Sequence, residues 1–304
     1  MINEMECLLV VIAVVAFVGN TLTVVLFIKK SKWLKKAHGC LIFALSIQDI
    51  LTAICLLSLP SFVLDHDAYP LPSSSIAREI FCSLVWSQYF AFALGVTSVY
   101  TCLMLTIERW FAVIKPLYYR KYEHSTAVVA VLVLIPWVAG FCFVISTPLD
   151  AKPIEQNGSF ICGWKKVESS TIERIPVAVF TFLGLFFIPA MIMVVAYVQI
   201  ILHMKRSRVR VGVTTSTARL KALKHVTLTA FFASSIIVVC WLPDQLYYAL
   251  SVVELTQLVS PAHSALHLLA FANSCINPFI YSFSNHEYRN GLKEMFSVWC
   301  RERS

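Results

Sequence analysis

Residues 7–28 read CLLVVIAVVAFVGNTLTVVLFI, a run of 22 residues without a charged side chain. A helix of about 20 apolar residues crosses the roughly 30 Å of hydrocarbon in a lipid bilayer. The whole chain of 304 residues is 58% hydrophobic and 14% charged, and its mean hydropathy is +0.74. A soluble core of this length does not bury so large an apolar fraction. The run therefore predicts a transmembrane helix, and the composition predicts several more.

Six further apolar runs of similar length follow the first. All seven are expected to be helical, because a segment in lipid must satisfy its backbone hydrogen bonds internally, and barrel strands would be shorter and alternating. Residues 285–299 separate apolar from charged side chains on two helical faces, which is typical of a helix lying on a membrane surface. The sequence thus predicts an all-α membrane protein, a single seven-transmembrane helix bundle over residues 1–304 with a short amphipathic helix at its C-terminal end. The predicted spans are 7–28, 40–64, 82–107, 126–149, 175–202, 226–253 and 261–283.

Positive charge is distributed unevenly over the connecting segments. If the N-terminus lies outside the cell, all but five of the 25 Lys and Arg residues fall on cytoplasmic segments. Membrane proteins show this bias toward a positive inner side. The net charge of +8 then reflects topology and contact with anionic membrane lipid, and nucleic acid is not expected as a partner. We expect a multi-pass protein of the plasma membrane with its N-terminus outside.

Polar residues at membrane depth form a second pattern. Asp49 lies near the middle of the second run, where a carboxylate costs about 2.5–3.5 kcal/mol on insertion scales. Carboxylate, hydroxyl and amide oxygens suit a small hard cation such as Na⁺. A hydrogen-bonded network that fastens the helices together, with Asp49 protonated, explains the same residues, so spacing alone leaves both interpretations open. The other polar residues at similar depth are Asn20, Ser98, Asn273, Ser274 and Asn277.

Several short motifs follow one another along the seven runs. They are Gly19-Asn20, Leu45-Ser46-Ile47-Gln48-Asp49, Glu108-Arg109-Trp110, Trp137, Pro189 with Tyr197, Cys240-Trp241-Leu242-Pro243 and Asn277-Pro278-Phe279-Ile280-Tyr281. Each motif is weak alone, but their order and spacing resemble the rhodopsin-like, class A family of G protein-coupled receptors over essentially the whole chain. The resemblance implies a receptor and not an enzyme. Such a receptor binds an extracellular ligand and activates a heterotrimeric G protein through outward movement of its sixth helix.

The resemblance also assigns roles to single residues. It implies a pocket for Na⁺ as an allosteric ion, with no other cofactor, formed by Asp49, Ser98, Asn273, Ser274 and Asn277. It implies that Glu108 holds Arg109 until activation releases the guanidinium to meet the G protein, with Leu117 as a second contact. Without the resemblance, this pair would read as an ordinary ion pair reaching the membrane surface. The implied activation switches are Glu108, Arg109, Pro189, Tyr197, Trp241, Pro243 and Tyr281.

The outer ends of the helices indicate a peptide ligand. Phe271 stands where opsins carry their retinal-linking Lys, and Ala91 stands where amine receptors carry an Asp. The stretch Trp241-Leu242-Pro243-Asp244-Gln245 resembles the galanin, allatostatin and somatostatin receptors, and an acidic outer surface favours a basic peptide. The predicted ligand-binding residues are Gln88, Phe92, Asp244, Gln245, Tyr248, His263, His267 and Phe271.

Two features of this outer set stay open. Asp244 needs a partner inside the sixth run, which is either a ligand cation or a capping or water contact. His263 and His267 lie one turn apart and could bind a metal ion. Because the sequence shows no acidic third ligand beside them, they are interpreted as pocket lining, and no metal other than Na⁺ is expected.

Covalent features and departures from the family pattern complete the expectations. Cys82 and Cys162 both fall on the outer side, where a disulfide can form. The outer segment also carries an Asn157-Gly158-Ser159 glycosylation acceptor, and Cys300 is a candidate for palmitoylation. In two respects the sequence departs from this family pattern. Ile237 stands where the family usually has a Phe, one turn below Trp241, and the gap from Cys82 to Arg109 is about half a turn longer than usual. The outer end of the third helix is therefore expected to bulge.

Other functions compete with the peptide receptor. A receptor for a small non-peptide ligand is one alternative, and a membrane channel or transporter is another from a different class. A channel or transporter needs a polar path across the bilayer, whereas the buried polar residues here converge on one central pocket. GTP exchange evoked by a ligand would distinguish a receptor from a channel.

Overall fold

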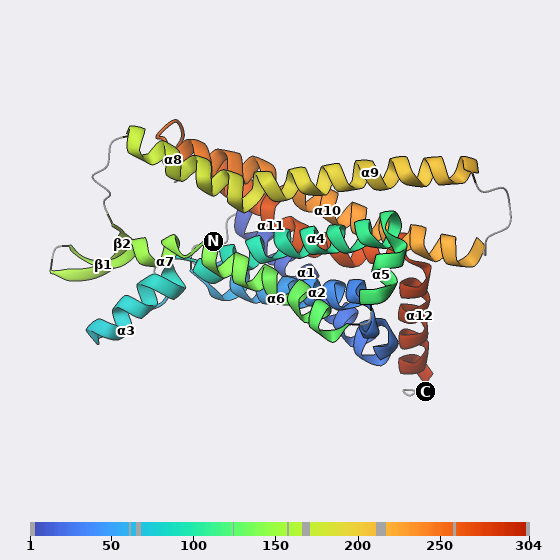
Figure 1. Cartoon of the computed structure of the whole chain (residues 1–304). Coiled ribbons are helices and arrows are strands. Elements are labelled where there is room, and N and C mark those ends of the chain that lie inside the picture. Colours follow the sequence, from blue (N-terminus) through green and yellow to red (C-terminus); the bar gives the residue numbers. More distant parts are fainter. Residues whose placement is uncertain are drawn as a thin grey trace.

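Helices account for most of the computed structural model (Figure 1). Of the residues that it describes, only two short strands and a few connections are not helical. The described residues are 4–60, 62–64, 68–123, 125–156, 158–165, 171–210, 217–257 and 260–301.

Seven spans run side by side through the described part of the chain, and they confirm the predicted bundle. Six of them are long and apolar enough to cross a membrane by length and composition. The seventh, α11, is less apolar because it carries two histidines and two asparagines, and it packs against α1, α2 and α10. The spans are α1 (Glu4–Lys29), α2 (Ala37–Ser58), α3–η2–α4 (Ser75–Ile80, Phe81–Trp86, Tyr89–Ile114), α6 (Thr126–Phe143), α8–η3–α9 (Thr171–Phe182, Leu183–Phe187, Ile188–Arg210), α10 (Thr217–Val252) and α11 (Pro261–Ser284).

The two ends of the bundle differ. At one end, called here the hairpin end, α7 (Ser146–Asp150) leads into the antiparallel strands β1 (Ala151–Gln156) and β2 (Ser159–Trp164) (Figure 1). The predicted disulfide between Cys82 and Cys162 is present and ties β2 to the turn η2. At the opposite end, called the α12 end, lie the turn η1 (Ser31–Lys35), the short helix α5 (Pro116–Tyr122) and α12 (His286–Arg301), which runs across the bundle.

Helix boundaries depart from the predicted spans where local chemistry overrides hydropathy. α2 ends at Ser58 and not at residue 64, because Pro60 forces the preceding Leu59 into an extended conformation. α10 begins at Thr217, nine residues before the predicted start, because a basic helix continues beyond the part that lipid would cover. Hydropathy detects the length that crosses lipid, and not the length of the helix.

The third span contains the expected bulge. Residues Phe81–Trp86 form a wide π-helical turn, and Gln88 then adopts a left-handed conformation with φ of 61° before α4 begins. The helical span therefore starts at Ser75 and ends at Ile114, longer than the predicted 82–107 at both ends. The additional half turn is absorbed between the disulfide and α4.

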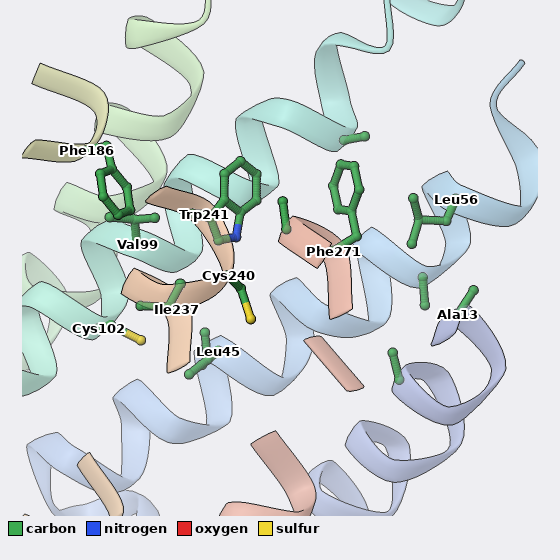
Figure 2. Close-up of a cluster of buried hydrophobic side chains, with 14 of the residues drawn as sticks. Ala13, Leu45, Leu56, Val99, Cys102, Phe186, Ile237, Cys240, Trp241 and Phe271 are labelled. Carbon is green, nitrogen blue, oxygen red and sulfur yellow. The ribbon is translucent and has the colours of Figure 1, made fainter. Parts of the chain in front are cut away.

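A hydrophobic cluster fills the middle of the bundle between the two ends (Figure 2). Trp241 of α10 and Phe271 of α11 meet edge to face, with ring centroids 5.8 Å apart. Ile237, one turn below the tryptophan, packs in the same cluster as Val99 and Phe186, so a β-branched residue fills the space that the family usually gives to Phe. α4 comes very close to the indole here, because a Cβ added at Gly95 would lie 2.1 Å from the ring of Trp241.

Candidate functional site

Asp49 of α2 is completely buried in the core of the bundle. Asn277 of α11 donates a hydrogen bond of 2.8 Å from Nδ2 to Asp49 Oδ2, and the Ser274 hydroxyl also bonds the carboxyl group. Ser98 of α4, by contrast, donates to Gln48 Oε1 at 3.4 Å, so it bonds the neighbour of Asp49 and not Asp49 itself. The structure thus brings Asp49 together with Ser274 and Asn277, and joins Ser98 through Gln48.

Several buried oxygens around this acid have no hydrogen-bond donor among the described residues. They are Asp49 Oδ1, Asn20 Oδ1, Asn273 Oδ1 and Thr52 Oγ1. The amide nitrogens of both asparagines are occupied, since Asn20 donates to the Ala16 and Ser274 carbonyls and Asn273 donates to Ala270. Unpaired buried oxygens are costly in an apolar interior. Because they are hard donors, this set fits a small cation such as Na⁺.

Glu108 and Arg109, at the α12 end of α4, are buried with exposed fractions of 4% and 2%. The guanidinium forms a bidentate, charge-assisted contact with the Glu108 carboxylate. Tyr119 of α5 donates to Glu108 Oε1 at 2.6 Å and accepts from Arg109 Nη2 at 3.2 Å, while His38 of α2 lies 3.2 Å from the same Nη2. We call Glu108, Arg109, Tyr119 and His38 the arginine lock; its burial argues against an ordinary ion pair at the membrane surface.

Tyr119 lies outside the membrane-spanning segments, and its protonation state follows from its surroundings. Burial, together with the adjacent Glu108 carboxylate, raises the pKa of the Tyr119 hydroxyl above its ordinary value. The hydroxyl therefore keeps its proton at neutral pH and remains a hydrogen-bond donor to Glu108.

Tyr197 of α9 and Tyr281 of α11, two further predicted activation switches, are both buried. Tyr197 of α9 accepts a hydrogen bond from Thr106 at 3.3 Å, and Thr106 also meets Ser234 of α10 at 3.1 Å. Tyr281 of α11 is buried, and its hydroxyl has no partner within the described ranges. These contacts join α4, α9 and α10 at the level where the predicted movement would occur.

The three prolines lie inside or beside distorted helix. Pro243 and Pro278 lie inside α10 and α11, where each removes a backbone donor. Pro189 follows the π-helical turn η3. The Tyr100 hydroxyl donates a hydrogen bond of 2.7 Å to the Gly184 carbonyl within that turn. A side chain of α4 thus supports the irregular part of the fifth span.

An aromatic group lies at the hairpin end above Trp241. Phe271 contacts Trp241 below and Phe92 beside it, with ring centroids 5.8 Å and 6.0 Å away. Phe62, in the connection after α2, meets Phe271 edge to face at 5.3 Å. Phe92 also contacts the ring of His267 at 5.4 Å. We call Trp241, Phe271, Phe92 and Phe62 the aromatic wall; they come from α10, α11, α4 and the connection after α2.

Asp244 lies against this wall, and it is not alone. It is 2% exposed, and its Oδ1 is 3.3 Å from His267 Nε2 and 3.7 Å from His263 Nε2. Gln245 donates a hydrogen bond of 3.2 Å to the other oxygen of the Asp244 carboxyl group, Oδ2. The acidic group that the two histidines lacked in sequence is therefore supplied by the neighbouring helix α10.

Other predicted residues are not joined to these groups. Gln88 donates to the Pro60 carbonyl at 3.4 Å, while Tyr248 is 37% exposed on α10. Leu117 is 80% exposed at the α12 end, as a contact for a partner protein requires. Asn157 and the side chain of Cys300 lie outside the described residues.

Sequence reasoning missed three participants: His38, Tyr119 and Phe62. Each lies in or next to a connection between helices, where hydropathy and motif spacing carry no signal. Only Tyr119 offered a hint, because it follows two residues after Leu117 in a segment already assigned to partner contact.

Comparison with known proteins gives a consistent result. Residues 19–281 match the family described as 7 transmembrane receptor (rhodopsin family). The chain is 23% identical to somatostatin receptor type 4 of Rattus norvegicus over 301 residues, which cover 97% of this chain and 73% of that receptor. It is 27% identical to melanin-concentrating hormone receptor 1 of Rattus norvegicus over 297 residues, covering 92% and 77%. It is 24% identical to somatostatin receptor type 2 of Mus musculus over 295 residues, covering 95% and 75%.

Proposed function

Because the chain belongs to the rhodopsin family of seven-transmembrane receptors, we propose that it binds a basic peptide at the hairpin end and activates a heterotrimeric G protein at the α12 end. The hairpin end and the N-terminus then face the outside of the cell. The family consists of receptors, so the chain is not an enzyme.

The buried arginine lock carries the proposal. A guanidinium enclosed by Glu108, Tyr119 and His38 cannot reach a partner protein unless α4, α5 or α2 changes its arrangement. Outward movement of the α12 end of α10 would disturb the contacts of Thr106 and Ser234 beside the lock. Arg109 and the exposed Leu117 then become available together to the G protein.

The peptide assignment is supported by the relatives and by charge. The relatives are named for receptors of somatostatin and melanin-concentrating hormone. In this chain the described acids near the hairpin end include Glu79, Asp150, Glu155 and Glu254, and a buried Asp244 lies deeper. An acidic mouth accelerates the encounter with a cationic ligand more than it raises affinity.

Na⁺ is proposed as the allosteric ion below the ligand site. Asp49, Asn273 and Ser274 would hold it, with Asn277 and Ser98 orienting the pocket. The bound ion would supply positive charge to a buried carboxylate. If Na⁺ favours the resting arrangement, agonist and Na⁺ weaken each other's binding by the same factor.

A nucleotide-exchange assay tests the proposed function. The purified chain in lipid nanodiscs is combined with G proteins of each subtype and screened against amidated peptides, and GTP exchange is measured. A basic peptide is expected to stimulate exchange in the wild type. Arg109→Ala should abolish the stimulation while peptide binding persists.

Arg120→Ala is the matched control, since Arg120 is exposed on α5 and loses the same charge outside the lock. It should retain most of the exchange. Full exchange in Arg109→Ala would contradict the role of the lock. Ion conductance by the chain without any exchange would favour a channel, and activation by small molecules alone would favour the non-peptide alternative.

A further inference from the structure

Three potential metal ligands converge at the hairpin end, on α10 and α11. One ring nitrogen of His263, one of His267 and one Asp244 oxygen all lie within 4.8 Å of one another. His263 and His267 are four residues apart, so both rings project from the same face of α11 toward Asp244. Oδ1 of Asp244 accepts no hydrogen bond in the described part of the chain, so its lone pairs are available.

The spacing of these atoms matches a compact coordination sphere. Zinc bonds imidazole nitrogen and carboxylate oxygen at about 2.0–2.1 Å, so two ligand atoms of a tetrahedral site lie about 3.3–3.4 Å apart. The distance from Asp244 Oδ1 to His267 Nε2 is 3.3 Å, and to His263 Nε2 it is 3.7 Å. The second distance must shorten by a few tenths of an ångström, and the two imidazole nitrogens, which lie within 4.8 Å of each other, must also reach about this spacing to place a metal ion between all three.

The surroundings hold the three ligands in this arrangement. Tyr247 stacks on the His263 ring at 5.0 Å, and the Tyr247 hydroxyl is itself fixed by Ser260 at 2.7 Å. Phe92 packs against the ring of His267. Gln245 occupies Asp244 Oδ2 and so directs Oδ1 toward the imidazoles. Partners of this kind orient metal ligands and tune their affinity.

The ligand types select the metal. Two imidazoles and one carboxylate suit zinc and similar transition metals, whereas Mg²⁺ and Ca²⁺ prefer sites made of oxygens alone. His267 has a side chain that is 24% exposed, whereas Asp244 and His263 are almost completely buried, so the ion would enter past His267. Three protein ligands leave a fourth position open to water or to a donor on a ligand.

We propose that Asp244, His263 and His267 form a Zn²⁺ site that bridges the sixth and seventh spans at the hairpin end. A bound ion fixes α10 to α11 beside the aromatic wall. Because Zn²⁺ and a cationic ligand group would both use Asp244 Oδ1, each reduces the affinity of the other by the same factor. Zn²⁺ binding itself does not depend on the identity of the ligand or of the G protein.

Direct titration of the purified full-length chain with Zn²⁺ tests the site. In isothermal calorimetry with the protein in nanodiscs, the wild type is expected to bind one Zn²⁺ and not to bind Mg²⁺. His267→Gln and Asp244→Asn should each weaken this binding by about 100-fold or more, since loss of a supporting partner alone costs about 10–100-fold. Gln245→Ala should weaken it by about 10-fold, because Asp244 is then less well oriented.

His203→Gln is the matched control, because it removes an exposed histidine on α9 at the α12 end of the bundle and should leave binding unchanged. Titration with Co²⁺ adds a spectroscopic readout, since intense visible bands indicate tetrahedral coordination. These bands should appear in the wild type and vanish in Asp244→Asn. The proposal is overturned if the wild type binds no Zn²⁺. It is also overturned if His267→Gln and Asp244→Asn both bind Zn²⁺ like the wild type and a thermal unfolding transition shows that both are folded. A wild type that binds Zn²⁺ without any peptide response would leave the metal site standing and contradict only the peptide receptor.

Discussion

Three carboxyl groups lie buried inside this bundle of apolar helices, and each of them has polar partners. Asp49, Glu108 and Asp244 are at most 4% exposed and lie on three different spans. Each has a different kind of partner: amide and hydroxyl groups at Asp49, a guanidinium at Glu108 and imidazoles at Asp244. Conservative changes at these residues therefore separate ion binding from the arginine lock.

Asp49→Asn should abolish stabilisation by sodium. A ligand that binds only the folded state stabilises it by RT ln(1 + [L]/Kd), about 1.4 kcal/mol when its concentration is about tenfold above Kd. Thermal unfolding of the wild type should therefore occur at higher temperature in NaCl than in choline chloride. The variant should show no difference between the two salts. Ser46→Ala, which removes a buried hydroxyl bonded to its own helix, should respond to sodium like the wild type.

Tyr119→Phe should raise basal signalling. The change removes the hydrogen bond of 2.6 Å to Glu108, and such a bond contributes about 0.5–1.5 kcal/mol, or up to about tenfold in the population of the unlocked state. Ligand-independent GTP exchange measures this population. Tyr118→Phe is the control, because the Tyr118 side chain is 65% exposed. Equal basal exchange in the two variants would remove Tyr119 from the lock.

At the scale of helices, the close approach of α4 to α10 depends on a missing side chain. Gly95→Ala would place a methyl group 2.1 Å from the Trp241 ring, so either the indole or the whole of α10 must move. Overpacking of this kind costs about 1–3 kcal/mol. Thermal unfolding should show a lower midpoint for Gly95→Ala than for Gly184→Ala, where the nearest atom is a Phe143 ring carbon at 3.3 Å. A midpoint equal to that of the control would mean that this contact is loose.

The sequence predicts the existence of the helical spans, but it does not predict all of their ends or their contacts with one another. Long apolar runs fix the existence of each span, and a gap that was too long by half a turn predicted the irregular region that now contains Gln88. Sequence did not place the end of α2, which depends on Pro60, nor the pairing of Asp244 with His263. Hydropathy and spacing describe one helix at a time, so they do not show that an acid on α10 lies beside two histidines of α11.

At the scale of the whole molecule, the uneven distribution of basic residues predicts the orientation in the membrane. α12 is fixed at the basic end by the Lys30–Glu294 ion pair at 2.6 Å and by the Thr23–Tyr288 hydrogen bond at 2.7 Å. Since positively charged segments remain in the cytoplasm, an epitope tag at the N-terminus should be stained on intact cells. A tag at the C-terminus should be stained only after permeabilisation. The reverse pattern would contradict the assigned outer and inner ends.

The left-handed Gln88 divides the third span of this chain into two helical registers. Residues counted outward from Arg109 and residues counted inward from Cys82 no longer share one helical register, because the π-helical turn and Gln88 lie between the two landmarks. An alignment made from either landmark alone assigns the other side to the wrong helical face. Helical faces on the outer part of this span are therefore counted from Cys82, and those on α4 from Arg109.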